Sequence, residues 1–145
     1  MLILIDTNIL LDVIIKREPH FILSEKIIDL CRREIINGAI AGHSVLNAMY
    51  ILRKRLTLTE RKEIFLNLCE FLYVESIDFG KIIQALKDDT FSDFEDCLQT
   101  QCALNIRADY IVTRNVKDFA ASEIPAITPE EFLKLLEEQG CLPTN

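Results

Sequence analysis

Three short stretches of the sequence carry acidic side chains at places where chemistry could occur. The first is Asp6-Thr7-Asn8, the second holds Asp93 and Asp96, and the third ends in Asp118. Carboxylates gathered in one site repel one another unless a cation neutralises them. Oxygen ligands without nearby Cys or His favour Mg²⁺ or Mn²⁺. An ion of this kind, holding a phosphodiester and activating water, makes hydrolysis of nucleic acid the natural reaction.

Short apolar strands are predicted to position these acids. The aliphatic run 2–5 is typical of a strand buried on both faces of a parallel sheet. Ligands of open α/β sheets bind at the carboxyl ends of strands, so Asp6 is predicted to lie where a site can form. Alternatively, Asp6 or Thr7 only caps the helix that residues 9–15 predict. The β-branched and aromatic run 109–113 repeats the pattern and is again followed by polar residues.

The order of strands and helices predicts the fold class. Residues 39–41, 73–77 and 124–127 predict three further strands, and helical patterns separate all of them. This alternation predicts an α/β fold with three layers, α/β/α, and a mostly parallel central sheet of about five strands. With no linker or repeat in the sequence, we expect a single domain spanning residues 1–145.

Local capping signals predict where several helices begin and end. Asn37-Gly38 is predicted to end one helix, because both residues favour the left-handed conformation. Ser44 is predicted to be the N-cap of the next. Residues 92–95 match a capping box, which predicts a helix that carries Asp93 and Asp96 three residues apart on one face.

Composition narrows the class of protein. The five cysteines are odd in number and form no Cys-x-x-Cys pair, which predicts reduced side chains in a cytoplasmic protein. The two histidines are far apart, which disfavours zinc. No stretch has the length of a membrane span, so no membrane association is expected. The net charge of −7 disfavours broad binding to nucleic acid, but a metal-bound carboxylate cluster accounts for part of such an excess.

Taken together and in this order, the motifs resemble those of the PIN domain, and more narrowly the small prokaryotic PIN proteins that include VapC-type toxins. The matching motifs are Asp6-Thr7-Asn8, the stretch DCLQTQCA that begins at Asp96, and the stretch TRNVKDF at 113–119. The resemblance spans residue 2 to about residue 136. It implies a metal-dependent ribonuclease, often the toxin of a toxin–antitoxin pair and commonly a homodimer, with RNA as substrate and an antitoxin protein as partner.

The resemblance also implies a role for each matching residue. The expected ligands of Mg²⁺ or Mn²⁺ are Asp6, Asp96 and Asp118, with Asp93 as an accessory acid beside them. The residues expected to support or shape the site by hydrogen bonding are Asn8, Thr113 and Asn115. The candidates for contact with RNA phosphates are Arg53, Lys54, Arg114 and Lys117, each of which could equally be an ordinary surface charge.

One position departs from the family pattern. The family usually has a Glu on the second helix, three residues after a Ser or Thr, and here Asn47 follows Ser44 at that spacing. The amide of Asn47 would leave the site with one negative charge fewer and weaken the binding of a second metal ion. A one-metal enzyme and a non-catalytic PIN-like module that binds RNA or protein are both open. A phosphatase with an aspartyl nucleophile is disfavoured, because Asn8 stands where a second Asp would be needed.

Overall fold

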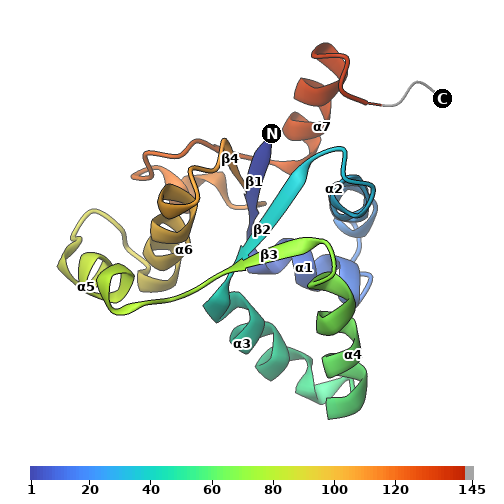
Figure 1. The fold of residues 1–145 in the computed structure, drawn as a ribbon, viewed down its shortest axis with the longest axis horizontal. Coiled ribbons are helices and arrows are strands. Elements are labelled where there is room, and N and C mark those ends of the chain that lie inside the picture. Colours follow the sequence, from blue (N-terminus) through green and yellow to red (C-terminus); the bar gives the residue numbers. More distant parts are fainter. Residues whose placement is uncertain (143–145) are drawn as a thin grey trace.

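A parallel sheet forms the centre of the computed structural model, which describes residues 1–142 (Figure 1). The strands lie in the order β3-β2-β1-β4-β5, and every neighbouring pair is parallel. Their bounds are β1 Leu2–Ile5, β2 Asn37–Ala41, β3 Leu72–Glu75, β4 Tyr110–Val112 and β5 Ala126–Ile127. The predicted α/β fold with a mostly parallel five-stranded sheet is confirmed. Residues 143–145, the end of the predicted domain, lie outside the described residues.

The strand order creates one place where the sheet can hold a ligand. From β1 the chain builds outward through β2 and β3, and then returns to add β4 and β5 on the other side of β1. The direction of winding therefore reverses between β1 and β4, and ligands of open α/β sheets bind outside the carboxyl ends of strands at such a reversal. The backbone N–H of Asp6 donates to the carbonyl oxygen of Val112 at 3.0 Å, which keeps these two strand ends together.

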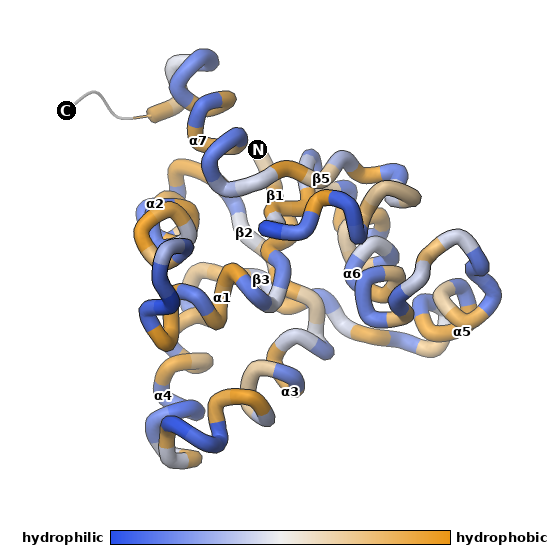
Figure 2. The backbone as a smooth tube through the Cα atoms, turned by 180° about the vertical axis from the view of Figure 1, so that it is seen from behind, coloured by the Kyte–Doolittle hydropathy of each residue, from blue (hydrophilic) through white to orange (hydrophobic). Residues whose placement is uncertain are grey.

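Helices cover both faces of the sheet. Ile3 and Ile5 pack with apolar side chains of α1, α2 and α7, whereas Leu4 packs on the opposite face with α6. All three side chains are fully buried, as predicted for a central strand. In Figure 2, apolar and polar residues alternate along the helices, as expected for helices with one buried side. The bounds are α1 Thr7–Ile14, α2 Phe21–Arg32, α3 Gly42–Ile51, α4 Leu58–Leu68, α5 Phe79–Lys87, α6 Phe94–Asn105 and α7 Pro129–Glu138, with short 3-10 helices η1 Leu52–Lys54 and η2 Val116–Phe119.

The predicted end of a helix at Asn37-Gly38 is wrong. Helix α2 ends at Arg32, and these two residues instead begin β2. A Cβ atom at Gly38 would lie 2.6 Å from Cys31 Sγ and 2.7 Å from Leu72 Cδ2, so the glycine permits close packing of the strand. The glycine thus serves the packing of the sheet and not the turn that local sequence suggested.

Two predicted N-caps are also wrong. Ser44 makes a tertiary hydrogen bond instead, and the residue next to Ser92 caps the other helix. Helix α3 begins at Gly42, and the buried Ser44 hydroxyl accepts a hydrogen bond from Thr7 Oγ1 at 2.7 Å. Helix α6 is capped by Asp93 and not by Ser92. Among residues 1–142, none of the helices has both the length and the apolar character needed to cross a bilayer.

Candidate active site

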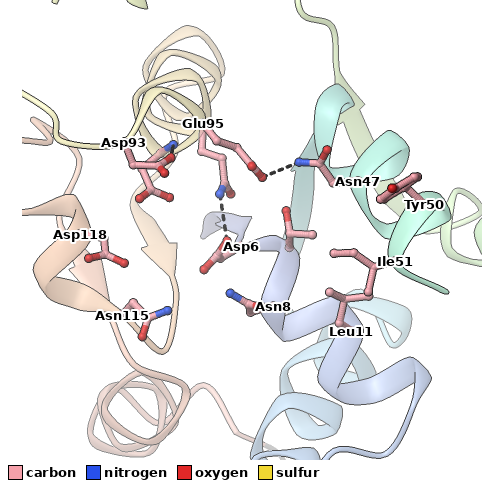
Figure 3. Close-up of a pocket in the computed structure, with 13 residues that line it drawn as sticks. Asp6, Asn8, Leu11, Asn47, Tyr50, Ile51, Asp93, Glu95, Asn115 and Asp118 are labelled. Carbon is pink, nitrogen blue, oxygen red and sulfur yellow. Dashed lines mark hydrogen bonds between the residues drawn. The ribbon is translucent and has the colours of Figure 1, made fainter. Parts of the chain in front are cut away.

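A pocket opens at the carboxyl ends of β1 and β4, between α1, α3 and α6 (Figure 3). Five acidic and four amide side chains line it, while no Lys, Arg, His or Cys among the described residues does so. The acids are Asp6, Asp93, Glu95, Asp96 and Asp118, and the amides are Asn8, Asn47, Gln99 and Asn115. The four predicted aspartates therefore reach one pocket although they come from three distant parts of the chain.

Asp6 is held by hydrogen bonds to both of its carboxylate oxygens. Gln99 Nε2 donates to Oδ1 at 2.9 Å, and Thr113 Oγ1 donates to Oδ2 at 2.8 Å. Thr113 Oγ1 in turn accepts from the backbone N–H of Asn115 at 3.0 Å. Asp6 occupies the N-cap position of α1 but makes no side-chain capping bond. Its carboxylate is therefore turned to the pocket and is not used to cap the helix.

Asp96 lies in the first turn of α6 and faces several other acids. Asp93 caps the helix, because its Oδ1 accepts from the backbone N–H of Asp96 at 3.0 Å. Burial raises the pKa of Asp96 to about 7, and the negative charges of Asp93, Asp6, Asp118 and Glu95 add to the effect. The Asp96 carboxyl is therefore partly protonated at neutral pH. A bound cation would favour the ionised form.

Glu95 joins two walls of the pocket. Asn47 Nδ2 on α3 donates to Glu95 Oε1 on α6 at 2.6 Å (Figure 3). Burial raises the pKa of Glu95, the bond from Asn47 lowers it, and the charges of Asp93 and Asp6 raise it again. His43 Nε2 lies 3.8 Å from the same oxygen. Burial lowers the pKa of His43 more than Asp6 raises it, so the ring is neutral at pH 7.

The sequence does not indicate a functional role for several residues of this pocket, of which Glu95 and Gln99 contact other polar lining residues. Local sequence explains Glu95 only as part of a capping box. The signal for Gln99 is its position three residues after Asp96, which puts both side chains on one face of α6. For Glu95 the signal is weaker, because its contact with Asn47 joins residues 48 positions apart.

The predicted phosphate contacts lie outside the pocket, and Arg114 already has a partner. Its Nε lies 2.8 Å from Asp12 Oδ2, and its Nη2 donates to Oδ1 at 3.2 Å. Asp12 is fully buried, and Arg17 lies 3.4 Å from the same carboxylate. The arrangement indicates that Arg114 neutralises a buried charge and links β4 to α1.

The other basic candidates are exposed. Arg53 stacks over the ring of Tyr50 at 3.6 Å and donates to the Tyr50 carbonyl oxygen at 2.7 Å. Tyr50 also lines the pocket, so this pair brings a positive charge close to its rim. Lys54 and Lys117 are exposed. The structure therefore leaves three of the four predicted basic side chains free to meet a phosphate.

The donor set of the pocket fits a hard divalent cation. All charged donors are carboxylates, and Mg²⁺ is commonly bound through one or two carboxylates while it keeps several waters. Within the described residues, however, no three His, Cys, Asp or Glu side chains lie close enough together to form a metal-binding group. The pocket thus offers oxygen donors for a hydrated ion without a closed coordination sphere.

Comparison with known proteins agrees with the sequence resemblance. A family model of the PIN domain matches residues 2–117. No curated protein matches the sequence. The fold is similar to that of a toxin–antitoxin complex from Klebsiella pneumoniae, with a TM-score of 0.63, 23% identity, and coverage of 87% of this chain and 96% of that chain.

Two further solved structures share the fold. VapBC2 from Rickettsia felis, bound to a DNA fragment from its promoter, matches with a TM-score of 0.64 and 17% identity, covering 88% of this chain and 98% of that one. VapC20 from Mycobacterium tuberculosis, described as a toxin that cleaves the sarcin–ricin loop, matches with a TM-score of 0.60 and 13% identity, covering 75% and 86%.

The raised pKa of Asp96 predicts a pH-dependent stability. In the folded chain the pKa of Asp96 is about 7, whereas the ordinary pKa of an aspartate is 3.8. The carboxyl therefore lowers the free energy of unfolding as the pH rises from about 4 to about 7. At pH 8, Asp96→Asn should be more stable than the wild type by about 1 kcal/mol after allowance for solvent screening, or a few degrees in Tm.

Thermal unfolding followed by circular dichroism checks this prediction at pH 8 and pH 4. The difference between Asp96→Asn and the wild type should be much smaller at pH 4, where the folded carboxyl is protonated and the unfolded one, with its ordinary pKa of 3.8, is about half protonated. Asp89→Asn is the matched control, because Asp89 is exposed. An equal difference in Tm at both pH values would contradict the assignment.

Arg114→Ala should destabilise the fold because it removes the closest partner of the buried Asp12. Leaving a buried charge without its partner costs about 3–5 kcal/mol, and Arg17 should reduce this cost. Urea denaturation measures the change in the free energy of unfolding. Lys117→Ala, at an exposed position, should change it by less than about 0.5 kcal/mol. Equal stability of the two variants would show that Arg114 has no such structural role.

Proposed function

The chain belongs to the PIN domain family, and we propose that it is a metal-dependent ribonuclease that hydrolyses RNA phosphodiester bonds. The observation that carries this proposal is the convergence of five carboxylates on one pocket that no basic side chain among the described residues lines. A cation best explains why so many acids are tolerated together. The all-oxygen donor set supports Mg²⁺ or Mn²⁺.

We assign the ion to Asp6, Asp96 and Asp118. When bound, it supplies positive charge to a phosphate oxygen and lowers the pKa of a water molecule. The protein's part is to hold its own oxygens in place. Gln99 and Thr113 fix the Asp6 carboxylate, since each donates to one of its oxygens.

Other polar residues complete the proposed site. Asp93 lines the pocket, accepts from the backbone N–H of Asp96, and would help to orient water beside Asp96. Asn8 and Asn115 also line the pocket and can donate hydrogen bonds to RNA or water. Their amides add donors without adding charge, which suits a site that already holds several acids.

RNA must be attracted by groups outside the acidic pocket. Arg53 stacks on Tyr50, which lines the pocket, and Lys117 precedes Asp118 in the sequence, so these exposed cations, together with Lys54, are candidates for contact with backbone phosphates. Tyr50 is 65% exposed and lines the pocket, so its ring, which Arg53 covers on one side, is a candidate surface for stacking an unpaired base on the other. Arg114 is not part of this proposal because it is paired with Asp12.

We further propose that the protein is the toxin of a toxin–antitoxin pair. Solved structures that share the fold include toxin–antitoxin complexes. Exposed apolar side chains on α3 and α4, such as Leu46 at 72% and Leu66 at 69%, support contact with a protein partner. A homodimer stays a prediction of the family resemblance, and a cytoplasmic location stays a prediction of the cysteine pattern.

A non-catalytic PIN module that binds RNA or protein is the second candidate. It is favoured by Asn47, which puts an amide where the family usually has a Glu. It is also favoured by the absence, within the described part of the chain, of a closed group of three metal-binding side chains. Such a module would bind RNA without cleaving it.

Asp6→Asn tests the catalytic proposal because it removes a charge from the centre of the pocket while it keeps the size and shape of the side chain. Purified protein is incubated with mixed RNA and Mn²⁺. The variant should cleave at least about 100-fold more slowly than the wild type, as expected for loss of a direct ligand. Chelation of the metal should abolish cleavage by the wild type.

Asp89→Asn is the matched control and should cleave RNA as the wild type does. Cleavage by both the wild type and Asp6→Asn would contradict the assignment of the site. Absence of cleavage by the wild type, together with RNA binding in a filter or fluorescence assay, would favour the non-catalytic module.

A further inference from the structure

Within residues 1–142, one of the two carboxylate oxygens of Glu95 accepts no hydrogen bond from another residue. Its Oε1 accepts from Asn47 Nδ2 at 2.6 Å. Its Oε2 forms no hydrogen bond within residues 1–142, and the side chain, 44% exposed, lines the pocket. The hydrogen bond restricts where Glu95 can point, because it ties the end of a flexible side chain on α6 to helix α3. One oxygen is thus anchored while the other stays available.

Gln99 is a second, independent feature of this pocket that calls for a polar partner. The side chain is 1% exposed, and its Nε2 donates to Asp6. Asp6 can only accept, which fixes the orientation of the amide and leaves Gln99 Oε1 buried without a partner in the described residues. A buried acceptor of this kind is unfavourable unless a water or a cation meets it.

We propose that Glu95 is an additional acidic residue of the active site, positioned by Asn47, and that its charge strengthens binding of the divalent cation. This inference rests on the proposed function, because the ion is the one assigned to Asp6, Asp96 and Asp118. It accounts for Asn47 directly. An amide can donate to Glu95, whereas an acid at that position would repel it. The negative charge that α3 lacks is then supplied from α6.

Among the described residues, no Lys or Arg forms an ion pair with Glu95. His43 Nε2 lies 3.8 Å from Glu95 Oε1, and the lowered pKa of His43 favours a neutral ring at pH 7. The competing explanation is that the Glu95 contact merely fastens α6 to α3. A variant that keeps the hydrogen bond and removes the charge separates the two.

Glu95→Gln is that variant, because the Gln carbonyl oxygen can still accept from Asn47. Isothermal titration calorimetry with Mn²⁺ at pH 8 should show a dissociation constant at least about 10-fold weaker than in the wild type. Glu63→Gln, on the exposed side of α4, is the matched control and should bind as the wild type does. An unchanged constant in Glu95→Gln would overturn the proposal and leave only the fastening role.

The part assigned to Asn47 is tested by a double-mutant cycle. Asn47→Ala should weaken Mn²⁺ binding several-fold in the wild-type background and have no further effect in Glu95→Gln, because it acts through the Glu95 charge. Additive effects would show that Asn47 does not position Glu95.

Failure of this inference and failure of the proposed function give different results. If the wild type binds Mn²⁺, and Asp6→Asn abolishes binding while Glu95→Gln does not weaken it, the inference about Glu95 is wrong and the proposed site stands. If the wild type takes up no Mn²⁺, both are wrong.

Discussion

Repulsion among carboxylates at the edge of a parallel sheet is the constraint on which this structure depends. Asp6, Asp93, Glu95, Asp96 and Asp118 share one pocket, and no basic side chain among the described residues lines it. The cost is visible in the pKa of Asp96, which burial and its acidic neighbours raise to about 7. Such a cluster destabilises the fold unless a cation neutralises it, which favours a functional role for these acids over a structural one.

The fold supports this cluster with uncharged donors and helix ends. Gln99 and Thr113 donate to Asp6 without neutralising it. Asp6 and Asp93 occupy the N-cap positions of α1 and α6, where the partial positive charge of a helix amino terminus favours an acid. Arg114 does not neutralise this cluster, because it pairs with the buried Asp12 and stabilises that carboxylate. The pocket thus keeps its negative charge available for a ligand.

The sequence was sufficient for the strands and for the convergence of the aspartates. Apolar runs that end in Asp6 and Thr113 are local signals, and the topology of a parallel sheet brings such ends together. The sequence was insufficient where a contact with a residue far away along the chain determines what a side chain does. The Ser44 hydroxyl meets Thr7 and not a helix end, and Arg114 meets Asp12 from 102 positions away. A local capping pattern already explains Glu95, and only its tertiary contact with Asn47 shows that it belongs to the pocket.

The central claim is that these distant carboxylates bind one kind of divalent ion in one pocket. Anomalous diffraction from crystals of the wild-type chain grown or soaked with Mn²⁺ at pH 8 tests it most directly. The account predicts an anomalous peak in the pocket within coordination distance of oxygens from Asp6, Asp96 and Asp118. A pocket without a peak at saturating Mn²⁺, or a peak bound only by residues outside it, would contradict the account.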